Sequence, residues 1–134
     1  MNTIVLISCA SKKRTTKSKA EAMYISPLFE KSLAYARKLK ADKIFILSAK
    51  YGLLDLDTEI EPYDLTLNEM PAREVATWAK RVFKQIAVQA DPARDHFIFL
   101  AGAKYRKYLI PMFASSEAPL ANLPIGKQLQ FLGK

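Results

Sequence analysis

Residues 3–7, Thr-Ile-Val-Leu-Ile, are an uninterrupted apolar run rich in β-branched side chains. Such a run is typical of a strand that is buried on both faces, as in the middle of a parallel sheet. Two further runs of this kind lie at residues 43–47, Lys-Ile-Phe-Ile-Leu, and at residues 96–100, His-Phe-Ile-Phe-Leu. The first two runs are separated by roughly the 30 residues that a strand-helix-strand unit needs, which favours a parallel pair. The sequence therefore predicts three buried strands.

Helical patterns occupy the intervals between these runs. Ser26 and Pro27 provide an N-cap and a proline at the first helical position, and apolar residues then repeat at helical spacing to about Lys40. Asn68 can cap a second helix, with Pro71 in its first turn. The apolar stripe of this second helix is Val75, Trp78, Ala79, Val82, Phe83, Ile86 and Ala90.

The remaining segments are less regular. A third helix is expected from Ala103 to about Phe113, and the tail from Pro119 carries enough apolar residues to dock as a short helix or strand. Between Tyr51 and Leu67 no long period holds, which indicates an ordered but irregular connection.

Strands that alternate with helices predict an α/β fold, a three-layer sandwich around a small, mainly parallel sheet with right-handed crossovers. We favour the strand order 2-1-3 over 3-2-1, because it places a topological switch point beside the end of the first strand. The length of 134 residues fits a single domain, residues 1–134, with one core.

Composition excludes several classes of protein. The lone Cys9 and the lone His96 exclude a disulfide framework and the usual Cys/His zinc sites. No signal peptide and no apolar stretch of roughly 20 residues is present, so a soluble, cytoplasmic protein without a membrane partner is expected. Neither the phosphate-binding Gly-x-x-x-x-Gly-Lys-Ser/Thr loop nor the Gly-x-Gly-x-x-Gly motif follows the first strand, so we expect no cofactor.

The chain is basic, with 21 Lys and Arg against 13 Asp and Glu, a net charge of +8. Such an excess favours phosphate, nucleic acid or an acidic partner, although many small proteins carry it for solubility alone. The charge is concentrated in a cationic loop that contains Lys12, Lys13, Arg14, Lys17 and Lys19.

Ligands of open parallel sheets bind beyond the carboxyl ends of the strands. The three strands are followed there by small residues and by residues that supply charge or stacking. The small residues are Ser8, Ser48, Ala49, Gly52, Ala101 and Gly102. The charged and aromatic ones are Lys50, Tyr51, Lys104 and Tyr105. Ordinary turn chemistry is the alternative explanation for these residue types.

Three residues are candidates for catalysis. Cys9 follows the first strand, and the ammonium groups of Lys12 and Lys13 nearby would favour its reactive thiolate, although a cysteine at a strand end is more often a small apolar filler. Asp64 can act as a general base or pair with Lys50, although a turn-capping aspartate is commoner. Lys50 is the third candidate. His96 opens the third strand at the opposite end of the sheet, so a Cys/His pair is not expected.

The acidic residues offer a weak alternative. Asp55, Asp57, Glu59 and Glu61 alternate along the chain and could present oxygen ligands to a divalent ion. Their spacing matches no calcium loop, and solvated acids are the much commoner explanation of such a pattern. We therefore expect no obligatory metal.

The sequence also resembles known families. The runs IVLISCASKK, MYISPLFEKSLAYA, FILSAKYGLLDLDTEIEPYDLTL and IGKQLQFL resemble a family of small bacterial and phage domains of unknown function. The segment SAKYGLLDLDTEIEPYDLTL is also similar to the YGLL-to-PYRLEM stretch of the YaaA peroxide-stress proteins, which are linked to DNA binding, with Asp64 in place of the arginine. Cys9 with Lys12 or Lys13 resembles the Pro-Cys-x-x-Lys segment of archaeosine synthases, which modify a base of transfer RNA, with Ser8 in place of the proline.

These resemblances imply a nucleic-acid or nucleobase setting, carried on Cys9, Lys12, Ser48, Lys50, Tyr51, Gly52, Pro62 and Tyr63. We therefore expect an enzyme that acts on a base or nucleotide held over the strand ends, with Tyr51 or Tyr63 stacking on the base and backbone amides near Gly52 and Gly102 binding oxyanions. The alternatives are a DNA- or RNA-binding module that uses residues 12–19 without catalysis, and an adaptor whose basic loop binds an acidic protein.

Overall fold

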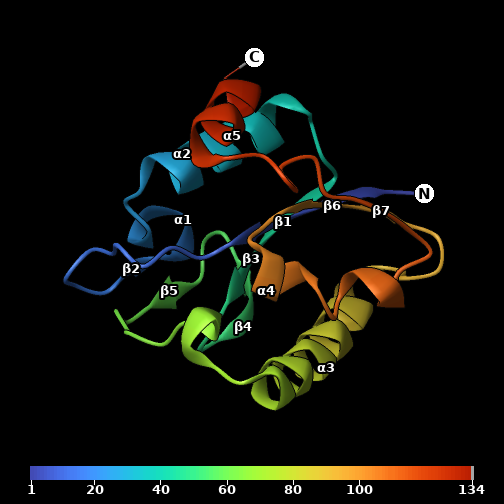
Figure 1. Ribbon diagram of the computed structural model, residues 1–134, viewed down its shortest axis with the longest axis horizontal. Helices are drawn as coiled ribbons and strands as arrows, with labels where there is room; N and C mark the ends of the chain where they lie inside the picture. Colours follow the sequence, from blue (N-terminus) through green and yellow to red (C-terminus); the bar gives the residue numbers. More distant parts are fainter. Residues whose placement is uncertain (134) are drawn as a thin grey trace.

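The computed structural model describes residues 1–133. A five-stranded sheet with the order β4-β3-β1-β6-β7 lies at its centre (Figure 1). In that order the strands are Gly52–Asp55, Lys43–Ser48, Thr3–Ser8, His96–Leu100 and Ser115–Glu117. β1, β3, β6 and β7 are parallel, whereas β4 is antiparallel to β3. The three strands expected from the sequence are confirmed, and so is their order 2-1-3, with the first strand between the other two.

Helices cover both faces of the sheet, so the fold is a three-layer α/β sandwich (Figure 1). α2 (Pro27–Lys38) and α5 (Ile125–Leu132) pack against each other on one side, and α3 (Ala72–Gln89) lies on the other. β1 is consequently buried on both faces, and residues 4–7 are at most 1% exposed. This burial explains why the run is continuously apolar rather than alternating.

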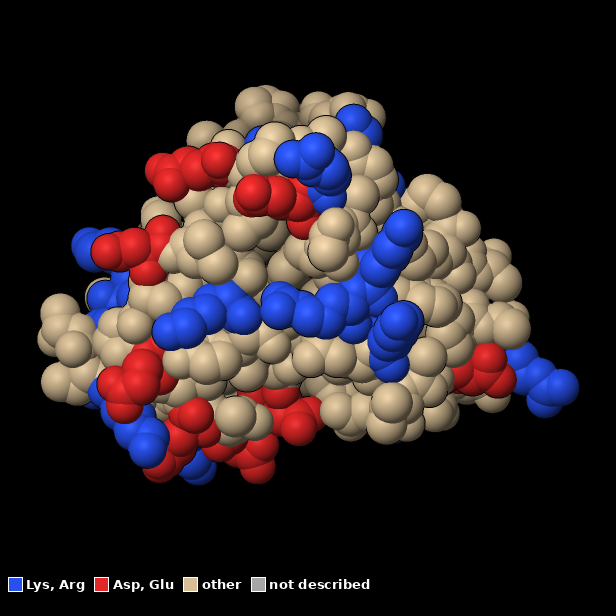
Figure 2. All heavy atoms as spheres, turned by 90° about the horizontal axis from the view of Figure 1, so that it is seen from below, with Lys and Arg blue, Asp and Glu red and all other residues tan. Residues whose placement is uncertain are grey.

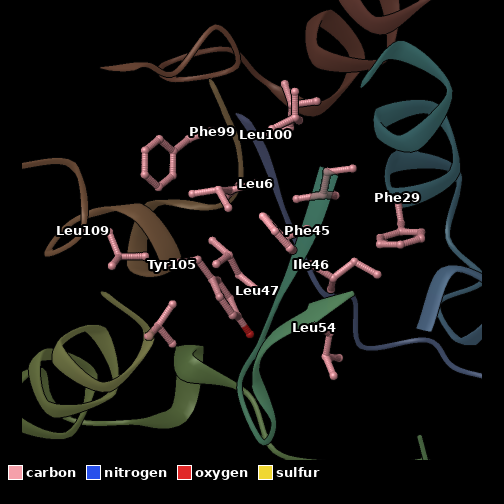
Figure 3. Packing of buried hydrophobic residues seen from close by; sticks show 14 of the residues in the cluster. Leu6, Phe29, Phe45, Ile46, Leu47, Leu54, Phe99, Leu100, Tyr105 and Leu109 are labelled. Atoms are coloured by element: carbon pink, nitrogen blue, oxygen red, sulfur yellow. The ribbon is translucent and has the colours of Figure 1, made fainter. Parts of the chain in front are cut away.

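The core on the α3 side joins residues from the two halves of the chain. Leu6 of β1 is in register with Phe45 of β3 and with Phe99 of β6, so these three side chains emerge from the same face of the sheet. Figure 3 shows Leu6 and Phe99 close to Leu109 and Tyr105, which follow β6 in the chain. Packing of this kind ties the segment after β6 to the middle of the sheet.

The helix limits differ from the expected ones in three places. Ser26 is the N-cap of α2, as expected, because its hydroxyl accepts a hydrogen bond of 3.1 Å from Phe29 N. However, α2 ends at Lys38 rather than at about Lys40. Asn68 does not cap α3. It lies inside a 3-10 turn, η1 (Leu67–Glu69), whose cap is Thr66, and α3 begins after Pro71, which is itself the N-cap.

The expected third helix is also wrong in length. A short α4 (Ala103–Arg106) is followed by a separate 3-10 turn, η2 (Ile110–Met112), which contains Pro111. The apolar tail was expected to dock as a short helix or as a strand, and it docks as the helix α5. None of the helices between residues 1 and 133 has the length and the apolar character that crossing a membrane requires.

The irregular connection contains strands that the sequence analysis missed. β4 occupies its beginning, and β5 (Glu59–Ile60) pairs with β2 (Ser18–Lys19) in a small antiparallel sheet. α1 (Ala20–Met23) follows β2 directly, so the cationic loop is held between β1 and this sheet. β7 was missed as well. Its sequence, Ser-Ser-Glu, has no apolar pattern, and it is a strand only because the free edge of β6 pairs with it.

Gly52 provides a test of the β3–β4 hairpin. Its φ is +76°, and a Cβ atom there would lie 2.4 Å from Oε1 of Gln85 on α3. Gly52→Ala should therefore lower the free energy of unfolding by about 1–2 kcal/mol, because an L-residue is strained in the left-handed conformation and its Cβ atom overlaps the Gln85 side chain. Gly126→Ala is the matched control, since apart from its chain neighbours and its own helix backbone nothing in residues 1–133 lies within 4 Å of its Cβ position. That substitution in α5 should raise stability by about 0.5–1 kcal/mol. Urea denaturation measures both, and equal effects would contradict the hairpin geometry.

Candidate functional site

The ends of β1 and β6 lie side by side, as expected for parallel neighbours. Ile7 is in register with Leu100, and Gly102 N donates a long hydrogen bond of 3.4 Å to the Ser8 hydroxyl. Cys9 N donates to Leu47 O at 3.0 Å, so the backbone at Cys9 is held against β3 as well. Cys9 is thus placed at the switch point, where the chain leaves the central strand with a neighbour on each side.

A cavity of about 330 Å³ opens at this point. Residues 8–10 at the end of β1 and residues 100–103 at the end of β6 form two of its walls, and the first turns of α2 form a third. Asn122 and Gln128 complete it from the chain around α5. Its volume is at the lower end of the range for small-molecule sites, roughly 300–1,000 Å³.

A second cavity of about 230 Å³ adjoins the first. It is lined by Lys13 of the cationic loop, by Asp64 and by the segment that leads into η1. Cys9 and Tyr105 line both cavities. The thiol and the phenol therefore lie in the wall that the two cavities share.

The Cys9 thiol is hydrogen-bonded to this phenol. Sγ of Cys9 lies 3.4 Å from Oη of Tyr105, which also accepts a long hydrogen bond of 3.4 Å from Leu67 N. Burial, together with the neighbouring Cys9, raises the pKa of Tyr105 to about 12. The phenol consequently keeps its proton at neutral pH, and its O–H can donate a hydrogen bond to a thiolate at Cys9.

Two further tyrosines lie next to this pair. Oη of Tyr63 is 2.6 Å from Oη of Tyr24 and 2.8 Å from the Ser48 hydroxyl, all of them buried. Burial raises the pKa of Tyr24 and of Tyr63 above its usual value, and nearby Cys9 adds to the rise. The Lys13 ammonium lies 4.5 Å from the centroid of the Tyr63 ring, at a cation–π distance. Lys13 is thereby held at the edge of the second cavity.

The structure brings together one part of the set expected from the sequence. Of the expected residues, Ser8 and Gly102 line the first cavity, and Lys13 and Asp64 line the second. Cys9 and Tyr105 line both. Ser48 and Tyr63 support these residues from the buried hydroxyl network. Lys12 is exposed and lines neither cavity.

Three expected residues lie apart from Cys9. Lys50 is exposed, with its ammonium 5.3 Å from the Tyr51 ring centroid, and lines a different groove. Tyr51 lines neither cavity: its ring packs against that of Tyr63, with centroids 5.6 Å apart, and its hydroxyl accepts a hydrogen bond of 3.3 Å from Glu61 N. Gly52 serves the hairpin described above. Asp64 and Lys50 form no ion pair within residues 1–133.

His96 lies at the opposite end of the sheet, as expected. Its Nε2 is 2.8 Å from a Glu117 carboxylate oxygen, and its Nδ1 is 2.6 Å from the Ser115 hydroxyl. Across the described chain, no three His, Cys, Asp or Glu side chains gather where they could hold a metal ion. Asp55, Asp57 and Glu59 are exposed side chains around the β4–β5 turn.

Sequence reasoning missed several polar residues that line the first cavity. Ser32 lies on the buried face of α2, and Asn68, Asn122 and Gln128 come from turns and from the C-terminal helix. Tyr24 was missed as the partner of Tyr63. Their polar residue types were the only signal in the sequence that could have marked them as site residues. Their proximity to Cys9 arises from the way α2, α5 and η1 pack on the strand ends.

Comparison with protein families gives one match. Residues 4–134 match the model of a family of unknown function, DUF6884, and the chain therefore belongs to this family. Searches of curated proteins and of solved structures returned no significant match.

The buried hydroxyl network should be visible in the pH dependence of stability. Tyr63→Phe should lower the free energy of unfolding at pH 8 by about 1–2 kcal/mol, because the Tyr24 and Ser48 hydroxyls lose a partner. Native Tyr63 has a raised pKa, so it keeps its proton above pH 10, whereas the unfolded chain loses it, and the wild type is destabilised as the pH rises. The variant lacks this titration. The difference between the two proteins should therefore shrink by about 1.4 kcal/mol between pH 8 and pH 11.

Urea denaturation at a series of pH values measures this difference. Tyr108→Phe is the control for removing a hydroxyl, since no hydrogen bond within residues 1–133 involves that hydroxyl. It should change stability at pH 8 by less than about 0.5 kcal/mol. A Tyr63→Phe difference that stays constant up to pH 11 would contradict the burial of the Tyr63 hydroxyl.

Proposed function

We propose that this member of DUF6884 is an enzyme that binds a nucleobase, or a nucleotide that carries it, at the ends of β1 and β6 and attacks it with the Cys9 thiol. The observation that carries the proposal is the position of Cys9 in the wall shared by two cavities, within hydrogen-bonding distance of a buried phenol. A structural cysteine needs no cavity beside it.

The lining of the first cavity suits a flat heterocycle with polar edges. Ala10, Ala101 and Gly102 let a ring approach the backbone closely, and Leu28 offers an apolar surface. Amide side chains can pair with the donors and acceptors along the edge of a base. Gln128 Nε2 donates to Leu123 O at 2.7 Å, and its amide oxygen is an acceptor that a base edge could use.

The chemistry that fits Cys9 is addition to an electrophilic ring carbon. The thiolate forms a C–S bond, the electron pair of the attacked double bond moves to a ring nitrogen, and that nitrogen takes up a proton. Tyr105 Oη, 3.4 Å from the Cys9 thiol, is the candidate acid for that proton, and Lys13 lines the second cavity beside the thiol. Asp64 on the same wall is the candidate base for the proton of the thiol.

The choice of substrate class also draws on the resemblances. Cys9 with Lys12 or Lys13 resembles the Cys-x-x-Lys segment of archaeosine synthases, in which the exact spacing corresponds to Lys12, and residues 48–67 are similar to a stretch of the YaaA proteins. Both groups work on nucleic acid or its bases. These resemblances support a base in preference to another flat ring.

A second candidate function is binding of DNA or RNA without catalysis, through the cationic loop. It is favoured by one observation: Lys12, Arg14, Lys17 and Lys19 are exposed, and none of them forms an ion pair in the part of the chain that the structure describes. In that case the cavities beside Cys9 would be structural.

Protection of the thiol tests the enzyme proposal directly, because Cys9 is the only cysteine. The rate of alkylation by iodoacetamide is measured by mass spectrometry with and without each of the common free bases, 7-deazaguanine bases, nucleosides and mononucleotides. A base that occupies the first cavity should slow alkylation by about tenfold when its concentration is about ten times its dissociation constant.

A matched control separates protection from quenching of the reagent. In Cys9→Ala combined with Val88→Cys, the only thiol replaces a side chain that is 85% exposed on α3. The ligand that protects Cys9 should leave this thiol unprotected. If no base, nucleoside or nucleotide slows alkylation of Cys9 relative to the control, the proposal is wrong.

A further inference from the structure

α3 carries a row of basic side chains on the face that points away from the sheet. Arg73, Lys80, Arg81 and Lys84 are all exposed, whereas the apolar stripe around Val82 is buried against the core. Figure 2 views the molecule from the side on which α3 lies, and there lysine and arginine side chains form a continuous row across the surface. The cationic loop that stood out in the sequence is a different segment.

The spacing along α3 suits a linear polyanion. At about 100° per residue, Arg73, Lys80 and Lys84 lie within about 40° of one another around the helix axis, with Arg81 on the flank. At about 1.5 Å per residue, the row extends about 16 Å along the helix. A nucleic-acid strand presents several phosphates over that length, about one per 3.4 Å in a duplex strand.

Among residues 1–133, no carboxylate forms an ion pair with these side chains. Within residues 1–133, neither the ion pair of Arg37 with Glu21 nor the hydrogen-bonded contact of His96 with Glu117 includes a residue of α3. Glu74 is the one acidic residue of α3, against four basic ones. The field of this face is therefore positive and available to a ligand.

A groove beside the row shares one lining residue with the second cavity. It has a volume of about 400 Å³ and lies beside α3, where Lys50, Arg73 and Arg81 supply three positive charges and Glu74 one negative charge. Leu65 lines this groove and also the second cavity beside Cys9. The segment around Leu65 is thus a partition with the basic groove on one side and the thiol cavity on the other.

We propose that the exposed face of α3, with Lys50, binds the phosphate backbone of a polynucleotide whose base enters the cavity beside Cys9. The inference rests on the proposed function and narrows its substrate from a free base or mononucleotide to a strand. It also gives Lys50 a role in binding rather than in catalysis.

The geometry favours a nucleic acid over an anionic membrane. A basic helix that binds a membrane must also insert an apolar face between the lipids. The apolar face of α3 is already packed on the sheet, and Val88 is the one large apolar side chain of this helix that is strongly exposed. Electrostatic attraction to a phosphate backbone needs no such insertion.

Fluorescence anisotropy with labelled 16-nucleotide single strands of mixed-sequence RNA and DNA, and with the corresponding DNA duplex, tests the surface. Arg73→Gln, Arg81→Gln and Lys84→Gln are combined in one variant. It should bind the preferred strand at least about tenfold more weakly at low salt. For a single strand, the slope of log affinity against log salt should become shallower by about 2, because about 0.7 is lost for each phosphate contact.

Two comparison variants carry the same change in charge. Lys31, Lys40 and Lys127 are exposed residues in or next to α2 and α5, on the other side of the sheet, and changing all three to Gln should leave binding within about twofold. Lys12, Arg14 and Lys17 are changed to Gln in the second variant, which tests the cationic loop. Circular dichroism and the melting temperature verify that all variants fold.

Protection of Cys9 links the surface to the cavity. A bound strand should slow alkylation of Cys9 more than the equivalent concentration of mononucleotide, and the α3 variant should lose this additional protection while it keeps the protection by a free base. A base that protects Cys9 in both proteins, with no strand bound by either, would leave the proposed function standing and overturn the α3 surface. If a strand binds in a way that depends on α3 but nothing protects Cys9, the α3 surface binds nucleic acid and the enzyme proposal is overturned.

Other results would also overturn the inference. If strand binding is weakened equally in the α3 variant and in the α2–α5 variant, the effect comes from net charge and not from a site on α3. Weakening in the cationic-loop variant alone would place the strand at residues 12–19. Absence of strand binding by the wild type at low salt, with binding to phosphatidylserine vesicles or to an acidic protein that depends on α3, would assign the surface to another partner.

Discussion

The parallel pairing of β1 with β3 on one edge and β6 on the other is the constraint on which the rest of the structure depends. Parallel strands finish at the same edge of a sheet, so the pairing brings Cys9 and Gly102 together although they are far apart in the chain. The same pairing leaves both faces of β1 apolar, and each face must be covered by helices. α2 and α5 on one side and α3 on the other follow from that requirement.

Polar groups at the edge of this apolar core have to satisfy one another. The hydroxyls of Tyr24, Tyr63 and Ser48 form one connected network, and Tyr105 holds the Cys9 thiol beside it. Within residues 1–133, every buried side-chain nitrogen and oxygen has a hydrogen-bond partner. An incomplete network would be costly in a low-dielectric interior, so the complete one fixes the segment after β1 in a single arrangement. The thiol is consequently presented from a rigid support.

The molecule carries two features of different character on adjoining surfaces. The cavity beside Cys9 is small and partly apolar, and it can hold one ring. The face of α3 is open and positive, and it suits an extended anion. The segment around Leu65 separates the two and contacts both. A partition of this kind allows one unit of a polymer to enter the cavity while its neighbours remain outside, which is how the two proposals fit together.

The sequence by itself determined the elements whose pattern is local: the three apolar runs, the N-cap at Ser26 and the amphipathic α3. It also determined that Cys9 and Gly102 would lie together, since parallel strands obey a general rule of position. Only the tertiary structure decided that β7 is a strand, that Lys50 lies outside the thiol site and that Tyr24 completes the hydroxyl network. Each of these depends on which distant segment packs alongside, and such contacts leave no periodic trace in the amino-acid sequence.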